Sequence, residues 1–332
     1  MTPSAQGYAR ASLAVALALS AAVLSACGGK HVPPPTSRES AIARAGHPVV
    51  SDFPAPNGRN IFELQKALRA NAVIGLATGT FTPGTDRLAY GVIGTDNAFV
   101  YGPSAVYVAA SPTAPVQGPF PAPLDSMQVA PRFQSKTVAE DPAAIKGIYE
   151  TQVPFTKPGT YGILGVVNVG GKLVGSITQT IVRASSPIPN IGQAPPRIHT
   201  PTLASVHGNV ASIDTRTPPD DMHKVDFASV IGKRPVALLF ATPQLCQSRV
   251  CGPVTDIAVQ LESQYARQMA FIHNEVYVNN DANKGLRPQL RAFRLQTEPW
   301  LFTINKRGRI AARLEGAFGI NAFHQAIEAA LH

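Results

Sequence analysis

The stretch that decides the fold runs Val236-Ala-Leu-Leu-Phe-Ala-Thr-Pro-Gln-Leu-Cys246-Gln-Ser-Arg-Val-Cys251-Gly252-Pro253. It joins a continuous apolar run, which suits a buried central strand, to two cysteines and the predicted start of a helix. Gly-Pro after the second cysteine favours a helix start, because proline is common in the first turn. The chain has three cysteines, and the third is Cys27. We therefore interpret Cys246 and Cys251 as the pair that carries the chemistry.

Strands and helices alternate after this stretch. Apolar runs between turn residues predict strands, and apolar residues at helical spacing predict helices. We predict strands at Val236–Ala241, Ala270–Val278, Trp300–Asn305 and Ile310–Glu315, and helices at Val254–Arg267, Pro288–Phe293 and Asn321–Leu331. The resulting order is β-α-β-α-β-β-α.

This order resembles the thioredoxin fold over roughly residues 200–332. The cysteines lie between the first core strand and the first long helix, and Thr297-Glu298-Pro299-Trp300 resembles the segment that carries the family's cis-proline. The resemblance implies that Pro299 stands beside the cysteines and that Glu298 offers backbone groups to an extended substrate. Trp300 either packs against the disulfide and substrate, as in relatives, or belongs to the core.

Four residues separate the two cysteines, whereas thioredoxins have two. Residues five apart do not meet on a regular helix, so Cys246 is expected in the loop and Cys251 at the helix N-terminus. Free N–H groups and the helix dipole stabilise a thiolate there, and Arg249 adds a nearby cation and a candidate substrate contact. This favours Cys251 as the thiol of lower pKa, whereas alignment with the first cysteine of the family favours Cys246 as the nucleophile. Both readings stay open.

The leading hypothesis is a thiol–disulfide oxidoreductase that uses the Cys246/Cys251 pair and needs no cofactor or metal. Copper handling of the Sco type is one alternative, with His273 or His223 as a third ligand, although the chain has no histidine between residues 274 and 323. A peroxiredoxin-like peroxidase is another, but Thr242 and Cys246 are one residue too far apart for the family's Thr-x-x-Cys pattern. The last is a fixed disulfide on a thioredoxin-like scaffold that serves for binding.

His273 and Asp256 are expected to have structural roles. His273 lies in a predicted strand, where a packed and hydrogen-bonded histidine is more common than a ligand, and Glu275 shares its face. Asp256 lies in the first turn of a predicted helix, where a carboxylate complements the helix dipole.

The preceding part of the chain is β-rich. We predict a short helical turn at Glu63–Arg69 and strands at Ala72–Thr78, Arg87–Ile93, Ala105–Ala109, Ile148–Val153, Gly159–Val169 and Lys172–Val182. Gly170-Gly171 predicts a hairpin, and Pro158-Gly-Thr-Tyr161 resembles the tyrosine corner of immunoglobulin-like sandwiches. We predict an immunoglobulin-like β-sandwich at 58–184 that serves as a binding or spacer module, with residues 112–131 as a surface excursion. A Pro-rich linker at 185–200 separates it from the thioredoxin-like domain at 201–332.

The first residues predict export. Arg10 precedes an apolar run that ends in Leu24-Ser-Ala-Cys27, which resembles a bacterial lipoprotein signal with its lipobox. The resemblance implies a signal peptide at 1–26 and lipid modification of Cys27, followed by a flexible Pro-rich tether at 27–57. The expected location is the extracytoplasmic face of the cell membrane. The expected partners are the thiols or disulfides of exported proteins and a membrane redox partner.

Composition argues against nucleic acid as a partner. The chain of 332 residues has a formal charge of +9, but its Lys and Arg residues are scattered and form no basic run with interleaved aromatic residues. The hydrophobic content of 45% is enough for two buried cores.

Overall fold

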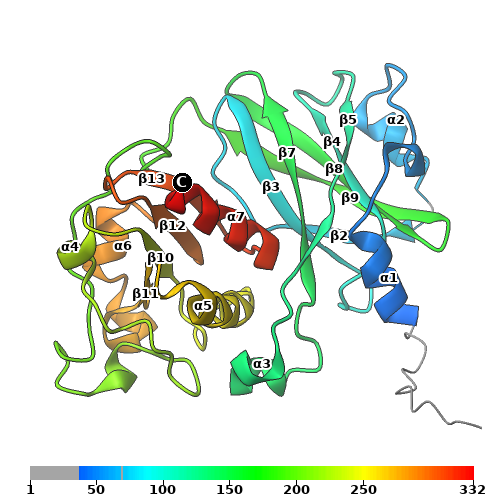
Figure 1. Ribbon diagram of the computed structural model, residues 1–332. Helices are drawn as coiled ribbons and strands as arrows, with labels where there is room; N and C mark the ends of the chain where they lie inside the picture. The colour runs from blue at the N-terminus through cyan, green and yellow to red at the C-terminus, as the bar shows by residue number, and fades with distance from the viewer. Residues whose placement is uncertain (1–36, 69) are drawn as a thin grey trace, which may run out of the picture. The chain divides into compact units, whose positions relative to one another are not determined.

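The computed structural model describes residues 37–68 and 70–332. The predicted signal peptide, Cys27 and the first part of the predicted tether lie outside these residues. The described residues include no helix long and apolar enough to cross a membrane. They form a β-sandwich built from β1 to β9 and a thioredoxin-like part built from β10 to β13 and α4 to α7 (Figure 1).

The thioredoxin-like part contains the predicted order of strands and helices. Its elements are α4 (Phe227–Val230), β10 (Val236–Phe240), α5 (Cys251–Tyr265), β11 (Ala270–Asn274), α6 (Pro288–Ala292), β12 (Trp300–Ile304), β13 (Ile310–Glu315) and α7 (Ile320–Leu331). The sheet order is β11-β10-β12-β13. Strand β10 pairs parallel with β11 across the α5 connection and antiparallel with β12, and β12 pairs antiparallel with β13. This topology confirms the thioredoxin-like prediction.

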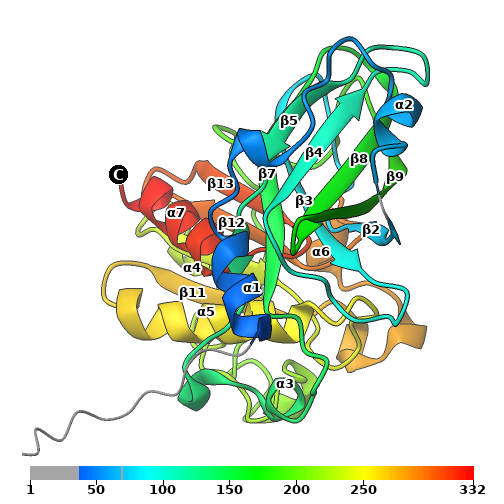
Figure 2. The same ribbon diagram turned by 90° about the vertical axis from the view of Figure 1, so that its right-hand side faces the viewer.

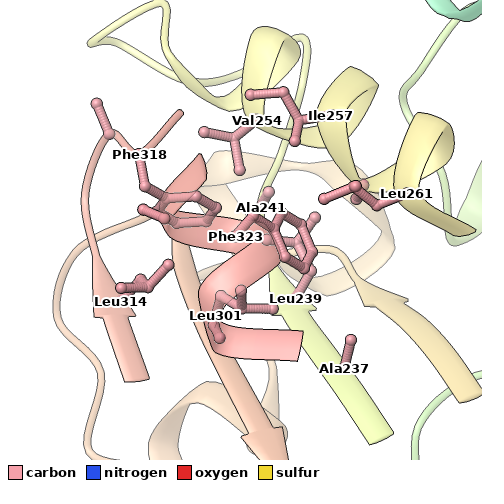
Figure 3. Close-up of a cluster of buried hydrophobic side chains, with 14 of the residues drawn as sticks. Ala237, Leu239, Ala241, Val254, Ile257, Leu261, Leu301, Leu314, Phe318 and Phe323 are labelled. Atoms are coloured by element: carbon pink, nitrogen blue, oxygen red, sulfur yellow. The ribbon is translucent and has the colours of Figure 1, made fainter. Parts of the chain in front are cut away.

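Strand β10 is buried on both faces, as its unbroken apolar sequence predicts. On one face, Leu239 packs in a cluster with Ile257 of α5 and Phe323 of α7 (Figure 3). On the other face, Phe240 packs with Phe293, which follows α6. Alternate side chains of β10 thus pack against helices on the two faces of the sheet. The strand leads directly into the loop that carries Cys246.

The β-sandwich has two sheets that share one hydrophobic cluster. One sheet contains β1 (Ala70–Asn71), β9 (Lys172–Val182), β8 (Gly159–Val169), β4 (Ser104–Ala109) and β5 (Gln117–Pro121), in that order. The other contains β2 (Val73–Leu76), β3 (Gly84–Ile93), β7 (Gly147–Phe155) and β6 (Leu124–Ser126). Figure 2 shows β5, β4, β8 and β9 side by side in the first sheet. Strands β5 and β6 lie in the stretch 112–131 that we predicted to be an excursion without strands.

Two local predictions for the sandwich can be followed in the hydrogen bonds. Strands β8 and β9 pair antiparallel around Gly170-Gly171, which forms the predicted hairpin turn. The Tyr161 hydroxyl donates to the carbonyl of Lys157 at 3.1 Å and accepts from its N–H at 3.2 Å. A tyrosine that bonds back to the backbone a few residues upstream is the contact that defines a tyrosine corner.

The stretch that we predicted to be a flexible tether up to residue 57 contains ordered elements from residue 37 onward. Helix α1 spans Ser37–Ala45, and a 3-10 turn spans Val50–Asp52. Ala45 and Phe53 are buried, so apolar side chains anchor this segment to the sandwich despite its Pro-rich composition. The remaining short helices are α2 (Ile61–Gln65), α3 (Lys136–Ala139) and 3-10 turns at Pro131–Phe133, Val210–Ser212, Val278–Asn280 and Ala282–Lys284.

The sandwich and the thioredoxin-like part share buried contacts. Ile145 and Ile148 of the sandwich belong to the same hydrophobic cluster as α5 and α7. Asp125 of β6 accepts hydrogen bonds from the N–H groups of Asn321 and Ala322 in the first turn of α7, at 3.0 and 2.8 Å. The predicted linker also packs against the fold, because Gln193 accepts a backbone hydrogen bond from β13. The two parts therefore pack as one body.

Candidate functional site

Cys246 and Cys251 form a disulfide, with 6.0 Å between their Cα atoms. Strand β10 ends at Phe240 and α5 begins at Cys251, so Cys246 lies in the connecting loop, as its spacing predicts. Cys251 is fully buried, whereas Cys246 is only partly buried. A partner can therefore reach the sulfur of Cys246 first, which favours Cys246 as the attacked and attacking sulfur.

Cys251 is the first residue of α5, where the helix has free N–H groups. This position stabilises a thiolate when the disulfide opens, so Cys251 is a good leaving group in exchange. The guanidinium of Arg249 forms an ion pair with Asp141 in the segment after α3. The guanidinium is exposed and the backbone of Arg249 has a φ of 60°, a left-handed conformation that is uncommon for arginine. The loop is thus tied to the sandwich through Arg249.

Glu298 places its side chain at the pair. The Glu298–Pro299 peptide bond is cis, as the resemblance implies. The Glu298 Oε2 atom lies 3.5 Å from the Cys251 sulfur and accepts a hydrogen bond of 2.8 Å from the N–H of Thr242. Burial raises the pKa of Glu298 to about 8, although the hydrogen bond from Thr242 opposes this rise. The sequence predicted a backbone role for Glu298, and the carboxyl group is an unpredicted part of the site.

A carboxyl group with this pKa can exchange a proton with Cys251. The ordinary pKa of a thiol, about 8.5, is close to that of Glu298, and efficient proton transfer needs such a match. Glu298 can accept the proton of the Cys251 thiol when a disulfide forms and return it when the disulfide opens. The geometry therefore supplies an acid–base group to the buried sulfur.

Pro299 and Trp300 are neighbours in the sequence but have different surroundings in the structure. Pro299 is buried beside Glu298, and its carbonyl accepts a hydrogen bond from Gly316. The ring of Trp300 stacks on Phe302 in the core face that α6 covers, and its Nε1 atom donates to Thr297 at 3.1 Å. Trp300 is 1% exposed, which fits the core alternative that the sequence left open.

Two pockets open beside the pair. One, of about 490 Å³, is lined by Ser248, Val250 and Glu298 together with residues of β2 and β3. The other, of about 600 Å³, is lined by Cys246 and Arg249 together with residues of α3 and the segment after it. Both pockets are therefore lined by the loop between β10 and α5 and by residues of the β-sandwich, an arrangement that sequence patterns do not predict.

The histidines proposed for a Sco-type copper site lie elsewhere. His223 and His273 cluster with Asp214 and Asp220, whereas the cysteine sulfurs cluster with Glu298. A carboxylate is a hard ligand that suits Cu(I) poorly, so this arrangement does not favour the copper alternative.

Asp256 and Glu275 have buried structural roles. Asp256 was predicted to complement a helix dipole but pairs with Arg216 at 2.9 Å and accepts from the Ser135 N–H at 2.8 Å. It thereby ties α5 to the sandwich and to the segment before β10. Glu275 accepts from the N–H of Thr215 at 2.7 Å.

No family model matches the chain, and no curated protein matches it. Among solved structures, a thiol:disulfide interchange protein of the thioredoxin family from Chlorobium tepidum TLS is 18% identical, with 43% of this chain and 99% of that chain covered and a TM-score of 0.30. The structure of MTB DsbF is 16% identical, with 41% of this chain and 96% of that chain covered and a TM-score of 0.27. The thioredoxin-like assignment rests on the strand order, the α5 connection and the cis-proline described above.

Proposed function

We propose that this protein exchanges thiols and disulfides through the Cys246/Cys251 pair, on the extracytoplasmic face of a bacterial cell membrane, with exported proteins as substrates. One observation carries the proposal. A partly exposed sulfur, Cys246, is bonded to a buried sulfur, Cys251, that has both a helix N-terminus and the carboxyl group of Glu298 beside it.

The exchange follows from this asymmetry. The Cys246 thiolate attacks a substrate disulfide, so a Cys246–substrate bond forms and one substrate sulfur leaves as a thiolate. Cys251 then gives its proton to Glu298 and attacks the Cys246 sulfur, which releases the second substrate thiolate and restores the Cys246–Cys251 disulfide. The substrate gains two electrons and the pair loses two. The reverse sequence oxidises a substrate dithiol, and a membrane redox partner would reset the pair in either direction.

We also propose that the protein is anchored to the membrane and that the sandwich contributes to substrate binding. Lipid modification at Cys27 would hold the protein at the membrane, as the lipobox-like Leu24-Ser-Ala-Cys27 suggests. The Tyr161 hydrogen bonds and the two-sheet core support an immunoglobulin-like sandwich. Its part in the function would be to form walls of the substrate pockets next to Cys246.

The test uses two single variants of the full mature chain and a peptide that contains one disulfide. In Cys251→Ser the free Cys246 thiol should attack the peptide, and the mixed disulfide should accumulate because no resolving thiol remains. In Cys246→Ser the buried Cys251 should form at least tenfold less adduct under the same conditions. Mass spectrometry of the acid-quenched mixture measures both. A failure of Cys251→Ser to form any adduct would contradict exchange and favour the fixed-disulfide alternative.

A further inference from the structure

A second polar cluster is buried away from the cysteine pair. Asp214, Asp220 and His223 lie in the segment before α4, and His273 lies on β11. Their side chains are 0%, 0%, 4% and 0% exposed. Each offers one ligand atom, and these four atoms lie within 4.8 Å of one another.

The distances within the cluster are those of a small coordination shell. The Nε2 atom of His223 is 3.5 Å from an oxygen of Asp214 and 3.5 Å from an oxygen of Asp220. The Nδ1 atom of His273 is 2.8 Å from Asp220 and 4.0 Å from Asp214. Ligand atoms about 2.0 Å from a tetrahedral zinc ion lie roughly 3.3 Å apart, so four atoms at these separations need only small shifts to bind one ion.

His223 gives the cluster an unfulfilled polar group. Neither of its ring nitrogens has a hydrogen-bond partner within residues 37–68 and 70–332. A buried imidazole without hydrogen bonds is costly, and such a group in a native fold needs an explanation. Its Nε2 atom points at two carboxylates from a distance too long for a hydrogen bond, and a metal ion between them would satisfy it.

His273 and Asp214 are held in place by further hydrogen bonds. The Nε2 atom of His273 lies 3.0 Å from the carbonyl of Ala241 and its Nδ1 atom lies 2.8 Å from Asp220, so a metal ion would replace the proton of the Nδ1–Asp220 hydrogen bond while Nε2 keeps its own. Asp214 accepts from the N–H of Arg216 at 2.8 Å and from that of Asp220 at 2.7 Å. Metal-binding histidines and carboxylates commonly have such outer hydrogen bonds, which fix their orientation.

The donor set selects the class of ion. Two carboxylates balance the charge of a divalent cation when both imidazoles bind it in their neutral form. Two nitrogen and two oxygen donors suit Zn²⁺ and similar transition ions better than Ca²⁺ or Mg²⁺, which prefer oxygen ligands in larger number. All four ligands come from the protein and are buried, which is typical of a structural site.

We propose that Asp214, Asp220, His223 and His273 bind one divalent transition-metal ion of the Zn²⁺ class in a closed structural site. The ion would fasten the segment before α4 to β11. The same segment contacts the loop between β10 and α5, because the Thr215 hydroxyl accepts a hydrogen bond of 3.2 Å from the N–H of Gln244, two residues before Cys246. The proposal does not depend on thiol–disulfide exchange.

The test titrates Zn²⁺ into the metal-stripped full mature chain with the cysteine pair oxidised, so that no thiolate competes for the ion. Isothermal titration calorimetry should show one site, and Zn²⁺ should raise the thermal midpoint of unfolding. Co²⁺ should produce the intense visible absorption of a tetrahedral complex. His223→Gln should weaken Zn²⁺ binding at least 100-fold.

The matched control is His199→Gln, which changes an exposed histidine that pairs with Asp226. It should bind Zn²⁺ as the wild type does. Asp214→Asn is the second ligand variant, in case His223→Gln fails to fold. The absence of a one-to-one Zn²⁺ complex in the wild type would overturn the proposal, and so would unchanged affinity in either folded ligand variant.

Discussion

Glu298 and Cys251 lie next to each other, with 3.5 Å between the carboxyl oxygen and the sulfur. Burial raises the pKa of Glu298 to about 8, so the carboxyl is a proton donor below this pH and a base above it. We predict that the rate at which Cys251 resolves a Cys246 mixed disulfide rises through about pH 8 in the wild type. In Glu298→Gln the rate at pH 8 should fall about 100-fold, the lower end of general acid–base effects, and should rise with pH only as the Cys251 thiol itself ionises.

Stopped-flow measurement of peptide release between pH 6 and 10 checks this prediction. Glu328→Gln is the control, because it makes the same substitution on α7, where Glu328 accepts from Tyr265. An unchanged pH profile in Glu298→Gln would remove Glu298 from the mechanism.

The cysteine spacing predicted the loop position of Cys246 and the helix start at Cys251, because both depend on local geometry. It did not predict which sulfur is accessible, since burial depends on packing from the whole fold. The carboxyl of Glu298 was missed for the same reason, as it reaches Cys251 across 47 residues of sequence. No sequence motif predicts that His273 and Asp214 lie in one cluster either.

At the scale of elements, the turn between β13 and α7 depends on Gly316. Its φ is 68°, and a Cβ atom would lie 1.6 Å from the carbonyl oxygen of Ala77 in the sandwich. We predict that Gly316→Ala lowers the free energy of unfolding by about 3 kcal/mol, because the backbone must move to relieve the clash. Gly308→Ala is a matched control with a φ of 72° but no atom nearer than 3.6 Å, and it should cost only about 1 kcal/mol. Urea unfolding measures the free energy of unfolding of both variants. Equal losses of this free energy in the two variants would contradict the role of the Ala77 contact.

Helix α7 begins at a carboxylate from another element, Asp125 of β6. Burial raises the pKa of Asp125 to about 6, against the ordinary 3.8, although the N–H groups of Ala322 and Asn321 oppose this. A raised pKa means that the protonated form contributes stability, fully below pH 3.8 and progressively less as the pH rises through 6. The free energy of unfolding of the wild type should therefore fall relative to that of Asp125→Asn between about pH 4 and 6. Denaturant titrations across this range measure the difference, and a constant difference would contradict the burial of the charge.

Most elements follow from the sequence, and the exceptions have physical reasons. The strand predicted at Gly159–Val169 has the same bounds as β8, because long apolar alternation specifies a central strand. Strand β5 was missed because Pro119 and Pro121 argue against a strand, yet β5 is at the edge of its sheet, where prolines are tolerated. Helix α1 was missed because the Pro-rich composition of the stretch around it predicted a flexible tether.

At the scale of the whole molecule, the sandwich and the thioredoxin-like part should unfold together. They share a hydrophobic cluster, and the buried Arg216–Asp256 ion pair joins α5 to the segment before β10, while Ser135 of the sandwich bonds to the same carboxylate. The fluorescence of Trp300, the only tryptophan, reports on the thioredoxin-like part. Its unfolding midpoint in urea should coincide with the loss of hydrogen-exchange protection in β8 and β9. Two separated midpoints would show that the parts are independent.

The reduction potential of the Cys246–Cys251 disulfide tests the central claim most directly. It can be measured in redox buffers of known potential, with alkylation of Cys246 as the readout and circular dichroism to show that the fold persists. A disulfide that exchanges with proteins should have a potential between about −120 and −270 mV, the range of known thiol–disulfide oxidoreductases, and should open without unfolding. A potential below about −300 mV, or reduction only after denaturation, would contradict exchange and identify a structural disulfide.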